Sequence, residues 1–149
     1  MYASLVPVME ILDPEGLPPL IGSNGEPVDV NDPEAYWSYG TVTESGTVYV
    51  SGQVGWDEDG NIVGEGDVQT QARQALDNFG KVLDAAGATP ADVAKVTAYV
   101  TDMDHAFKLA DVRNDFFGDH TPASSIVEVD ELYVEGLLVE IEGVAAVPR

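Results

Sequence analysis

The chain contains no cysteine and few basic residues, and each shortage excludes a class of function. Without cysteine there is no disulfide framework, no thiolate nucleophile and no thiolate metal site. Lysine and arginine number 6 against 27 aspartates and glutamates, for a formal net charge of −21. Because nucleic acids are bound through cationic side chains that neutralise phosphates, we expect no nucleic-acid partner. Anionic membrane surfaces are disfavoured for the same reason.

Long hydrophobic runs are also absent. No apolar run approaches the roughly 18 residues of a membrane span, and the N-terminus lacks the pattern of a signal peptide. These features predict a cytoplasmic protein. Repulsion among the acidic groups would destabilise a fold in dilute buffer, whereas molar salt shortens the Debye length to about 3 Å and screens it. The acid excess indicates either adaptation to a high-salt cytosol or an ordinary acidic protein.

The 149 residues suffice for one domain with a buried core, and 44% of them are apolar. Residues 1–36 hold six of the nine prolines and show no sustained periodicity, which predicts an irregular Pro/Gly-rich arm. Residues 37–149 are regular and predict a single α+β domain.

Within that domain, the hydrophobic patterns predict the order ββαβαββ. Strands are expected at 47–54, 62–63, 92–101, 124–129 and 137–147, and helices at 68–86 and 104–117. Asp67 is placed as the N-cap of the first helix and Gly87 as its end, and Phe107 is expected near the apolar side of the second helix. The economical arrangement is a sheet with both helices on one face and another subunit on the other face.

The familiar metal motifs are absent. Asp57, Asp59 and Asn61 have partial calcium-loop spacing, but the glycine and the distal glutamate of such a loop are misplaced, so a hairpin turn is favoured. His105 and His120 stand fifteen residues apart without a partner motif. We therefore expect no metal site.

Two glutamates on the last expected strand are candidate functional residues. In residues 137–142, strand alternation places Glu140 and Glu142 on the face opposite Val139 and Ile141. Two interpretations stay open: a solvated acidic face, or a carboxylate in a subunit cleft that acts as a general acid or base.

Several segments occur in the order and spacing of one known family. They are Ser51–Val54, Gln71–Asn78, Lys95–Met103, Thr121–Ala123 and Glu140–Glu142. With these segments the chain resembles the Rid (YjgF-like) reactive-intermediate deaminases over about residues 35–147. The resemblance implies a chorismate-mutase-like α+β subunit with two helices on one face of the sheet, and a homotrimer with a cleft between each pair of neighbouring subunits.

The resemblance also implies an activity. Members of the family hydrolyse small imine or enamine intermediates, which makes them hydrolases of C=N bonds, and they release ammonia without a metal or other cofactor. Glu140 matches the glutamate that positions the attacking water or relays protons. Ser51 and Gly52 match a ligand-contacting segment, and Ile126 matches a later backbone contact.

Of the positions that depart from the family pattern, three belong to the expected site. Ser124 stands at the position where the family has an arginine that binds the substrate carboxylate through two hydrogen bonds. A serine hydroxyl offers only one weak, uncharged donor in its place. Trp37 stands where a tyrosine contacts the ligand. Arg113 occupies a usual tyrosine position, either as a substitute cation or in an ion pair at the surface. The departures predict a wider, less cationic and more aromatic cleft than that of the arginine-bearing deaminases.

The working hypothesis is a Rid-like homotrimer that hydrolyses a neutral or larger imine or enamine. The alternative is a non-catalytic trimer of the same family that binds small metabolites or acts like a chaperone.

Overall fold

The computed structural model describes residues 9–148, so residues 1–8 of the expected arm lie outside the described residues. Four short strands come first: β1 (Glu10–Ile11), β2 (Leu20–Ile21), β3 (Pro27–Val28) and β4 (Gly40–Val42). The longer elements are β5 (Thr47–Val54), α1 (Val68–Ala85), β6 (Val93–Val100), α2 (Ala110–Phe117), β7 (Ala123–Glu128) and β8 (Val139–Ala146). Two 3₁₀ helices, η1 (Pro90–Asp92) and η2 (Met103–Leu109), flank β6.

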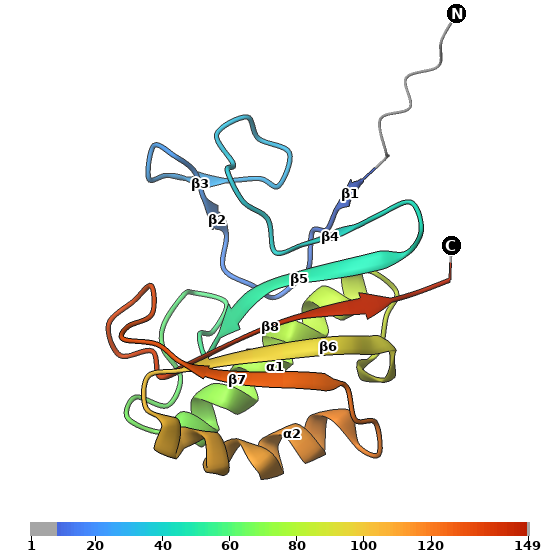
Figure 1. The fold of residues 1–149 in the computed structure, drawn as a ribbon. Coiled ribbons are helices and arrows are strands. Elements are labelled where there is room, and N and C mark those ends of the chain that lie inside the picture. The colour runs from blue at the N-terminus through green and yellow to red at the C-terminus, as the bar shows by residue number, and fades with distance from the viewer. Residues whose placement is uncertain (1–8, 149) are drawn as a thin grey trace, which may run out of the picture.

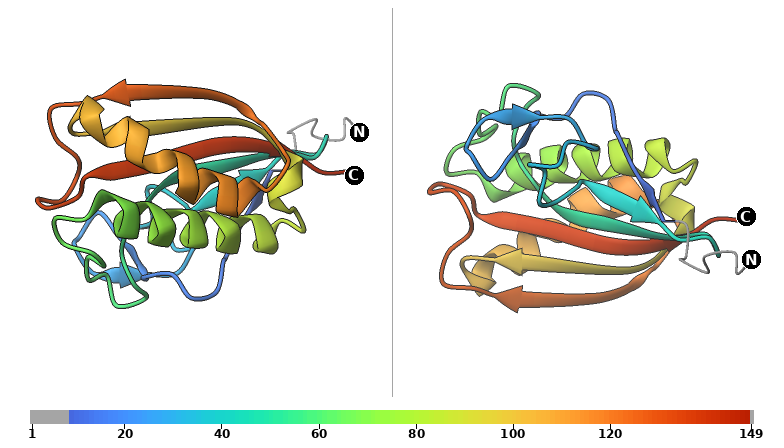
Figure 2. Two further views of the ribbon diagram at one scale, coloured as in Figure 1. Left: turned by 90° about the horizontal axis from the view of Figure 1, so that it is seen from below. Right: turned by 90° about the horizontal axis from the view of Figure 1, so that it is seen from above.

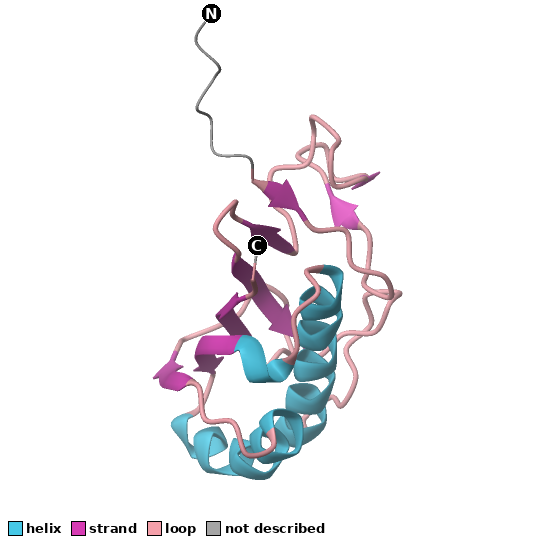
Figure 3. Cartoon of the chain, turned by 90° about the vertical axis from the view of Figure 1, so that its right-hand side faces the viewer, coloured by secondary structure: helices cyan, strands magenta, loops and turns pink. Residues whose placement is uncertain are grey.

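Six strands form one mixed sheet in the order β1-β4-β5-β8-β6-β7. All neighbours are antiparallel except β6 and β7, which run parallel. Helices α1 and α2 both cover one face of this sheet (Figures 1 and 3). The predicted α+β fold with two helices on one face is thereby confirmed. Helix α1 lies between α2 and the N-terminal segment that carries β2 and β3 (Figure 2).

Helix α1 has the predicted boundaries. The Asp67 carboxylate accepts hydrogen bonds from the backbone nitrogens of Gln69 and Thr70, and Gly87 ends the helix at a φ of 72°. Its apolar stripe is buried against β5 and β8 from Val68 to Leu83. The Phe79 ring packs directly on Gly143 of β8, where an added Cβ would fall 2.7 Å from Phe79 Cζ. A glycine there lets the helix approach the sheet closely.

The second predicted helix is divided. Residues 103–109 form the 3₁₀ helix η2, and only residues 110–117 are α-helical. Because a 3₁₀ helix has three residues per turn, its side chains do not continue the α-helical stripe. Phe107 is consequently 86% exposed, so its expected place near the apolar side was wrong. Leu109 and Val112 are the buried residues across the junction.

Described residues of the expected arm join the same core. Strand β1 pairs with β4, and the backbone nitrogen of Leu12 donates to the Gly40 carbonyl at 2.9 Å. Leu12 and Leu20 are both buried. The turn at residues 57–61 forms as predicted, with the Asp57 carboxylate accepting from two backbone nitrogens. The expected return strand at 62–63 is reduced to one bridge between Trp56 and Ile62.

The other face of the sheet is open in the single chain. Tyr49 is 50% exposed on β5, and Val127 is 43% exposed on β7. A depression of about 380 Å³ on this face is lined in part by Ser51, Lys95 and Glu142.

Candidate active site

A cavity of about 520 Å³ lies at one end of β5 and β8. Its walls come from four separate parts of the chain, and most of its lining is apolar or aromatic. The lining residues are Pro18, Pro19, Ile21, Tyr36, Trp37, Ser51, Gly52, Val54, Trp56, Asp59, Gly60, Tyr133, Leu137 and Glu140. Its volume suits a small organic molecule.

The Glu140 carboxylate is one of two carboxylates in the lining of this cavity, the other being that of Asp59. Glu140 lies on β8, opposite Val54 on one side and Tyr99 on the other. Burial raises the pKa of Glu140 above its ordinary value, and the neighbouring Glu142 carboxylate raises it further. Within residues 9–148, no side chain donates a hydrogen bond or forms an ion pair to this carboxylate. It is therefore available to a ligand or a water molecule.

Gly52 makes room for that carboxylate. A Cβ added at Gly52 would lie 2.0 Å from Glu140 Oε1 and 2.7 Å from Cδ. The pairing of β5 with β8 shifts between Val50 and Gln53, so Ser51 and Gly52 form a β-bulge. Bulges re-aim side chains beside active sites, and here the extra residue brings the glycine under the glutamate.

Ser51 is fixed by the segment that precedes β4. Its backbone nitrogen donates to the Tyr39 carbonyl at 2.9 Å, and its hydroxyl donates to the Ser38 carbonyl at 2.6 Å. The Tyr39 hydroxyl donates to the Pro18 carbonyl at 2.9 Å, and burial raises the pKa of Tyr39 to about 12. The Trp37 ring packs edge-on against Tyr39, with 4.9 Å between ring centroids. These contacts hold the wall formed by residues 18–37.

Two buried amides of α1 hold the opposite walls. The Gln71 side-chain nitrogen donates to the carbonyls of Gly64 and Gly136, and its oxygen accepts from the Leu138 nitrogen at 2.8 Å. The Asn78 side-chain nitrogen donates to the carbonyls of Val54 and Trp56. Both amides are fully buried, so each loop is anchored to the helix by hydrogen bonds that water cannot replace.

The structure brings together four residues that the sequence singled out. Trp37, Ser51, Gly52 and Glu140 all line the cavity. Sequence reasoning did not single out the other lining residues, most of which lie in irregular segments without periodicity; Ile21 on β2 and Val54 on β5 are the exceptions. The aromatic ones carry a usable signal: the chain has two tryptophans, and both Trp37 and Trp56 line this cavity.

The other three predicted site residues lie elsewhere in the chain. Ser124 and Ile126 are on β7, which β6 separates from β8. Ile126 is in register with the buried Ala98 and packs against the core, so its side chain faces the helices. Arg113 is half-buried on α2, where burial lowers the pKa of its guanidinium. None of the three lines the cavity at Glu140 within one chain.

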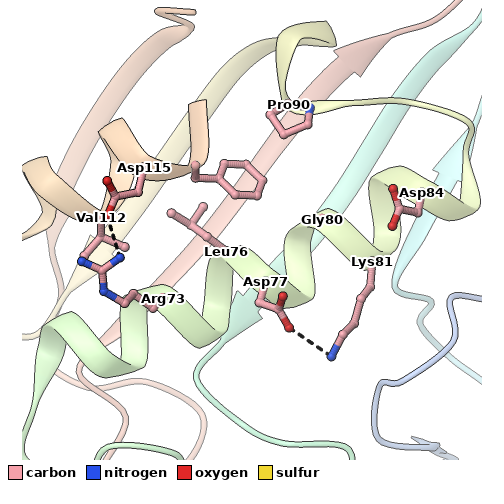
Figure 4. Close-up of a pocket in the computed structure, with 10 residues that line it drawn as sticks. Arg73, Leu76, Asp77, Gly80, Lys81, Asp84, Pro90, Val112 and Asp115 are labelled. Carbon is pink, nitrogen blue, oxygen red and sulfur yellow. Dashed lines mark hydrogen bonds and ion pairs between the residues drawn. The ribbon is translucent and has the colours of Figure 1, made fainter. Parts of the chain in front are cut away.

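A second groove of about 430 Å³ runs between α1 and α2 (Figure 4). Its cations are already paired: Arg73 contacts Asp115 at 2.8 Å and Lys81 contacts Asp77 at 3.3 Å. The Arg73–Asp115 pair is solvent-exposed on both sides, and such pairs contribute little to stability. The groove contains none of the predicted site residues, so the cavity at Glu140 is the better candidate.

The part of the chain that the structure describes holds no cluster of three or more histidine, aspartate or glutamate side chains suited to a metal ion. Among residues 9–148, no helix combines the length and apolar character needed to cross a membrane.

Comparison with known proteins gives consistent matches. The family model described as endoribonuclease L-PSP matches residues 29–147. A RutC family protein of Pyrococcus horikoshii is 35% identical over 116 residues, covering 77% of this chain and 91% of that protein. A 2-iminobutanoate/2-iminopropanoate deaminase of Dermatophagoides farinae is 34% identical, covering 77% and 90%. The solved structure of YyfA, a Rid family protein of Yersinia pestis, has a TM-score of 0.79 at 31% identity, covering 94% of this chain and 100% of that one.

Proposed function

This chain belongs to the endoribonuclease L-PSP family, which includes the RutC and Rid proteins, and we propose that it hydrolyses reactive imine or enamine intermediates with release of ammonia. The observation that carries the proposal is the unpaired, half-buried Glu140 carboxylate over Gly52 in an aromatic cavity. The family's printed description names a ribonuclease. RNA cleavage is not proposed, because the net charge is −21 and the described cavity lining includes no lysine or arginine.

The chemistry needs one acid–base group. The Glu140 carboxylate accepts a proton from a water molecule while the water oxygen bonds to the carbon of the protonated imine, which gives a neutral carbinolamine. Glu140 then returns that proton to the carbinolamine nitrogen. As the C–N bond breaks and ammonia leaves, the hydroxyl proton passes back to the Glu140 carboxylate and the carbonyl forms. The raised pKa of Glu140 suits both halves of this cycle, because a general acid–base group works best with a pKa near the ambient pH.

We further propose that the substrate is a larger imine or enamine, or one that is neutral in the sense that it carries no carboxylate. Ser124 stands where the family resemblance implies a carboxylate-gripping arginine, and the described lining around Glu140 offers no cation in its place. Trp37 with the other aromatic walls supplies area for an apolar substrate body.

The proposal includes a homotrimer in the cytoplasm. The open sheet face carries exposed Tyr49 and Val127, which a neighbouring subunit would cover. Ser124, Ile126 and Arg113 lie away from Glu140 in one chain, so they would contribute to a cleft only across a subunit boundary. The cytoplasmic location rests on the sequence features given above.

The test is ammonia release from freshly generated imines, with and without a carboxylate, in molar salt. Glu140→Gln should lower turnover by about 10²–10⁴-fold, the usual contribution of a general acid–base group, and leave the oligomeric state unchanged in light scattering. Unchanged turnover in this variant would remove Glu140 from the mechanism. Ligand binding without turnover by the wild-type protein would indicate the non-catalytic alternative.

A further inference from the structure

The charged groups that face the cavity at Glu140 all have one sign. Glu140 and Asp59 contribute carboxylates, and the described lining includes no lysine, arginine or histidine. Lys95 lines the neighbouring depression on the open sheet face, where Ser51 forms part of both linings. The Lys95 ammonium donates to the Ser125 hydroxyl at 2.7 Å and shares that depression with Glu142. The part of the cavity that one chain forms is therefore lined by net negative charge.

The hydrogen-bonding groups of the lining also favour a cation, because the charged ones are all acceptors. The Ser51 hydroxyl already donates its proton to the Ser38 carbonyl at 2.6 Å, so toward a ligand it can only accept. The carboxylates of Glu140 and Asp59 are acceptors as well. The side-chain donors are neutral: two tyrosine hydroxyls and two indole nitrogens, and the indole nitrogen of Trp56 is buried. An N–H-bearing cation would find charged acceptors here, whereas a carboxylate would find only neutral donors.

The aromatic walls favour the same kind of ligand. Tyr36, Trp37, Trp56 and Tyr133 surround the cavity. The faces of aromatic rings attract cations that lie within about 6 Å, tryptophan most strongly. The same rings, with Pro18 and Leu137, supply apolar surface for a flat hydrocarbon body.

We propose that this cavity selects cationic ligands, namely a primary ammonium or iminium group attached to an apolar, planar body, with the nitrogen at Glu140 and Ser51. This inference rests on the proposed function in that it names the charge and shape of that site's substrate. The substrate would be the protonated imine, which is also the more electrophilic form. The net reaction then converts an iminium ion and water into a carbonyl compound and an ammonium ion, so atoms and charge balance.

The experiment uses three probes that share one ring and differ in charge. Benzylamine is cationic at neutral pH, benzyl alcohol is neutral and benzoate is anionic. Binding to the full-length protein is followed by tryptophan fluorescence, because the only two tryptophans of the chain both line the cavity. Calorimetry at the same salt concentration supplies the dissociation constants.

We expect benzylamine to bind more tightly than benzyl alcohol, and benzoate to bind least. Glu140→Gln should weaken the binding of benzylamine by roughly tenfold to a hundredfold, which is the effect of losing a hydrogen bond to a charged group. The same change should leave the affinity for benzyl alcohol unchanged. Asp59→Asn should weaken the binding of benzylamine to a smaller extent, because Asp59 lies on the exposed turn. Asp84→Asn, in the groove between α1 and α2, is the matched control and should change nothing.

Three results would overturn the inference: benzoate binding at least as tightly as benzylamine, benzylamine affinity unchanged in Glu140→Gln, or no binding of any probe. The experiment tests this inference separately from the proposed hydrolase function. Charge-selective binding without imine turnover would retain the inference and reject the hydrolase, whereas turnover limited to anionic imines would retain the hydrolase and reject the inference.

Discussion

Replacement of Gly52 by alanine should disable Glu140 without unfolding the protein. The added Cβ would lie 2.0 Å from Glu140 Oε1, whereas ordinary contact begins at about 3.4 Å, so the carboxylate must move by at least 1.4 Å. All three nearest atoms belong to the Glu140 side chain, which can rotate away from the strand. Gly52 does not have a positive φ, so alanine fits the backbone.

The expected magnitudes follow from this geometry. A displacement of about 1 Å at a reacting group costs on the order of 10²-fold in rate, so turnover should fall by at least about that factor. The new rotamer costs about 0.5–1.5 kcal/mol, and removal of a glycine from a strand returns about 0.5–1 kcal/mol. The free energy of unfolding should therefore change by less than about 1 kcal/mol.

Two comparisons make the experiment decisive. In the double variant Gly52→Ala with Glu140→Gln, the alanine should cause no further loss of turnover, since both changes remove the same group. Gly143→Ala is the structural counterpart: its Cβ would meet the Lys95 carbonyl at 2.8 Å and the Phe79 ring at 2.7 Å, so it should destabilise the fold by about 1–3 kcal/mol. Wild-type turnover in Gly52→Ala, or additive losses in the double variant, would refute the placement of Glu140 over Gly52.

Two further predictions concern stability. Because the folded protein raises the pKa of Glu140, it binds this proton more tightly than the unfolded chain, and ionisation of Glu140 lowers stability as the pH rises above the ordinary glutamate range. Glu140→Gln should therefore be more stable than wild type at about pH 7 and equal to it at about pH 4 in urea denaturation, and an equal difference at both pH values would contradict this. Leu12→Ala should lower stability by about 2–4 kcal/mol, whereas Ile11→Ala, at a position 43% exposed, should cost under about 1 kcal/mol. Equal small losses in both would show that the N-terminal segment adds nothing to the core.

The regular elements were predictable because each one depends on a local pattern. Helix α1 follows from an apolar stripe between Asp67 and Gly87, and β5, β6 and β8 follow from alternation. The α-helical pattern failed only at residues 103–109, where a 3₁₀ helix changes the spacing of the side chains. The expected YjgF-like fold is confirmed by the match to the Rid family structure.

The site was predictable only in part. The family resemblance singled out Trp37, Ser51, Gly52 and Glu140, and all four line the cavity, whereas their roles there stay a prediction. Pro18, Tyr36 and Tyr133 were not found, since irregular segments approach the cavity through long-range hydrogen bonds such as that of Tyr39 to Pro18. No local pattern encodes such contacts.

Because of the position of β8 in the sheet, the candidate site is complete only when the whole sheet has formed. Strand β8 is the last described strand in sequence, yet it lies between β5 and β6. Glu140 pairs with Val54, 86 residues earlier (140 minus 54), so this contact closes a long loop, and contacts of such sequence separation slow folding. During synthesis, β5 and β6 leave the ribosome before the strand that joins them. Under the proposed function, a nascent chain would therefore have no acid–base group in place until its sheet closes.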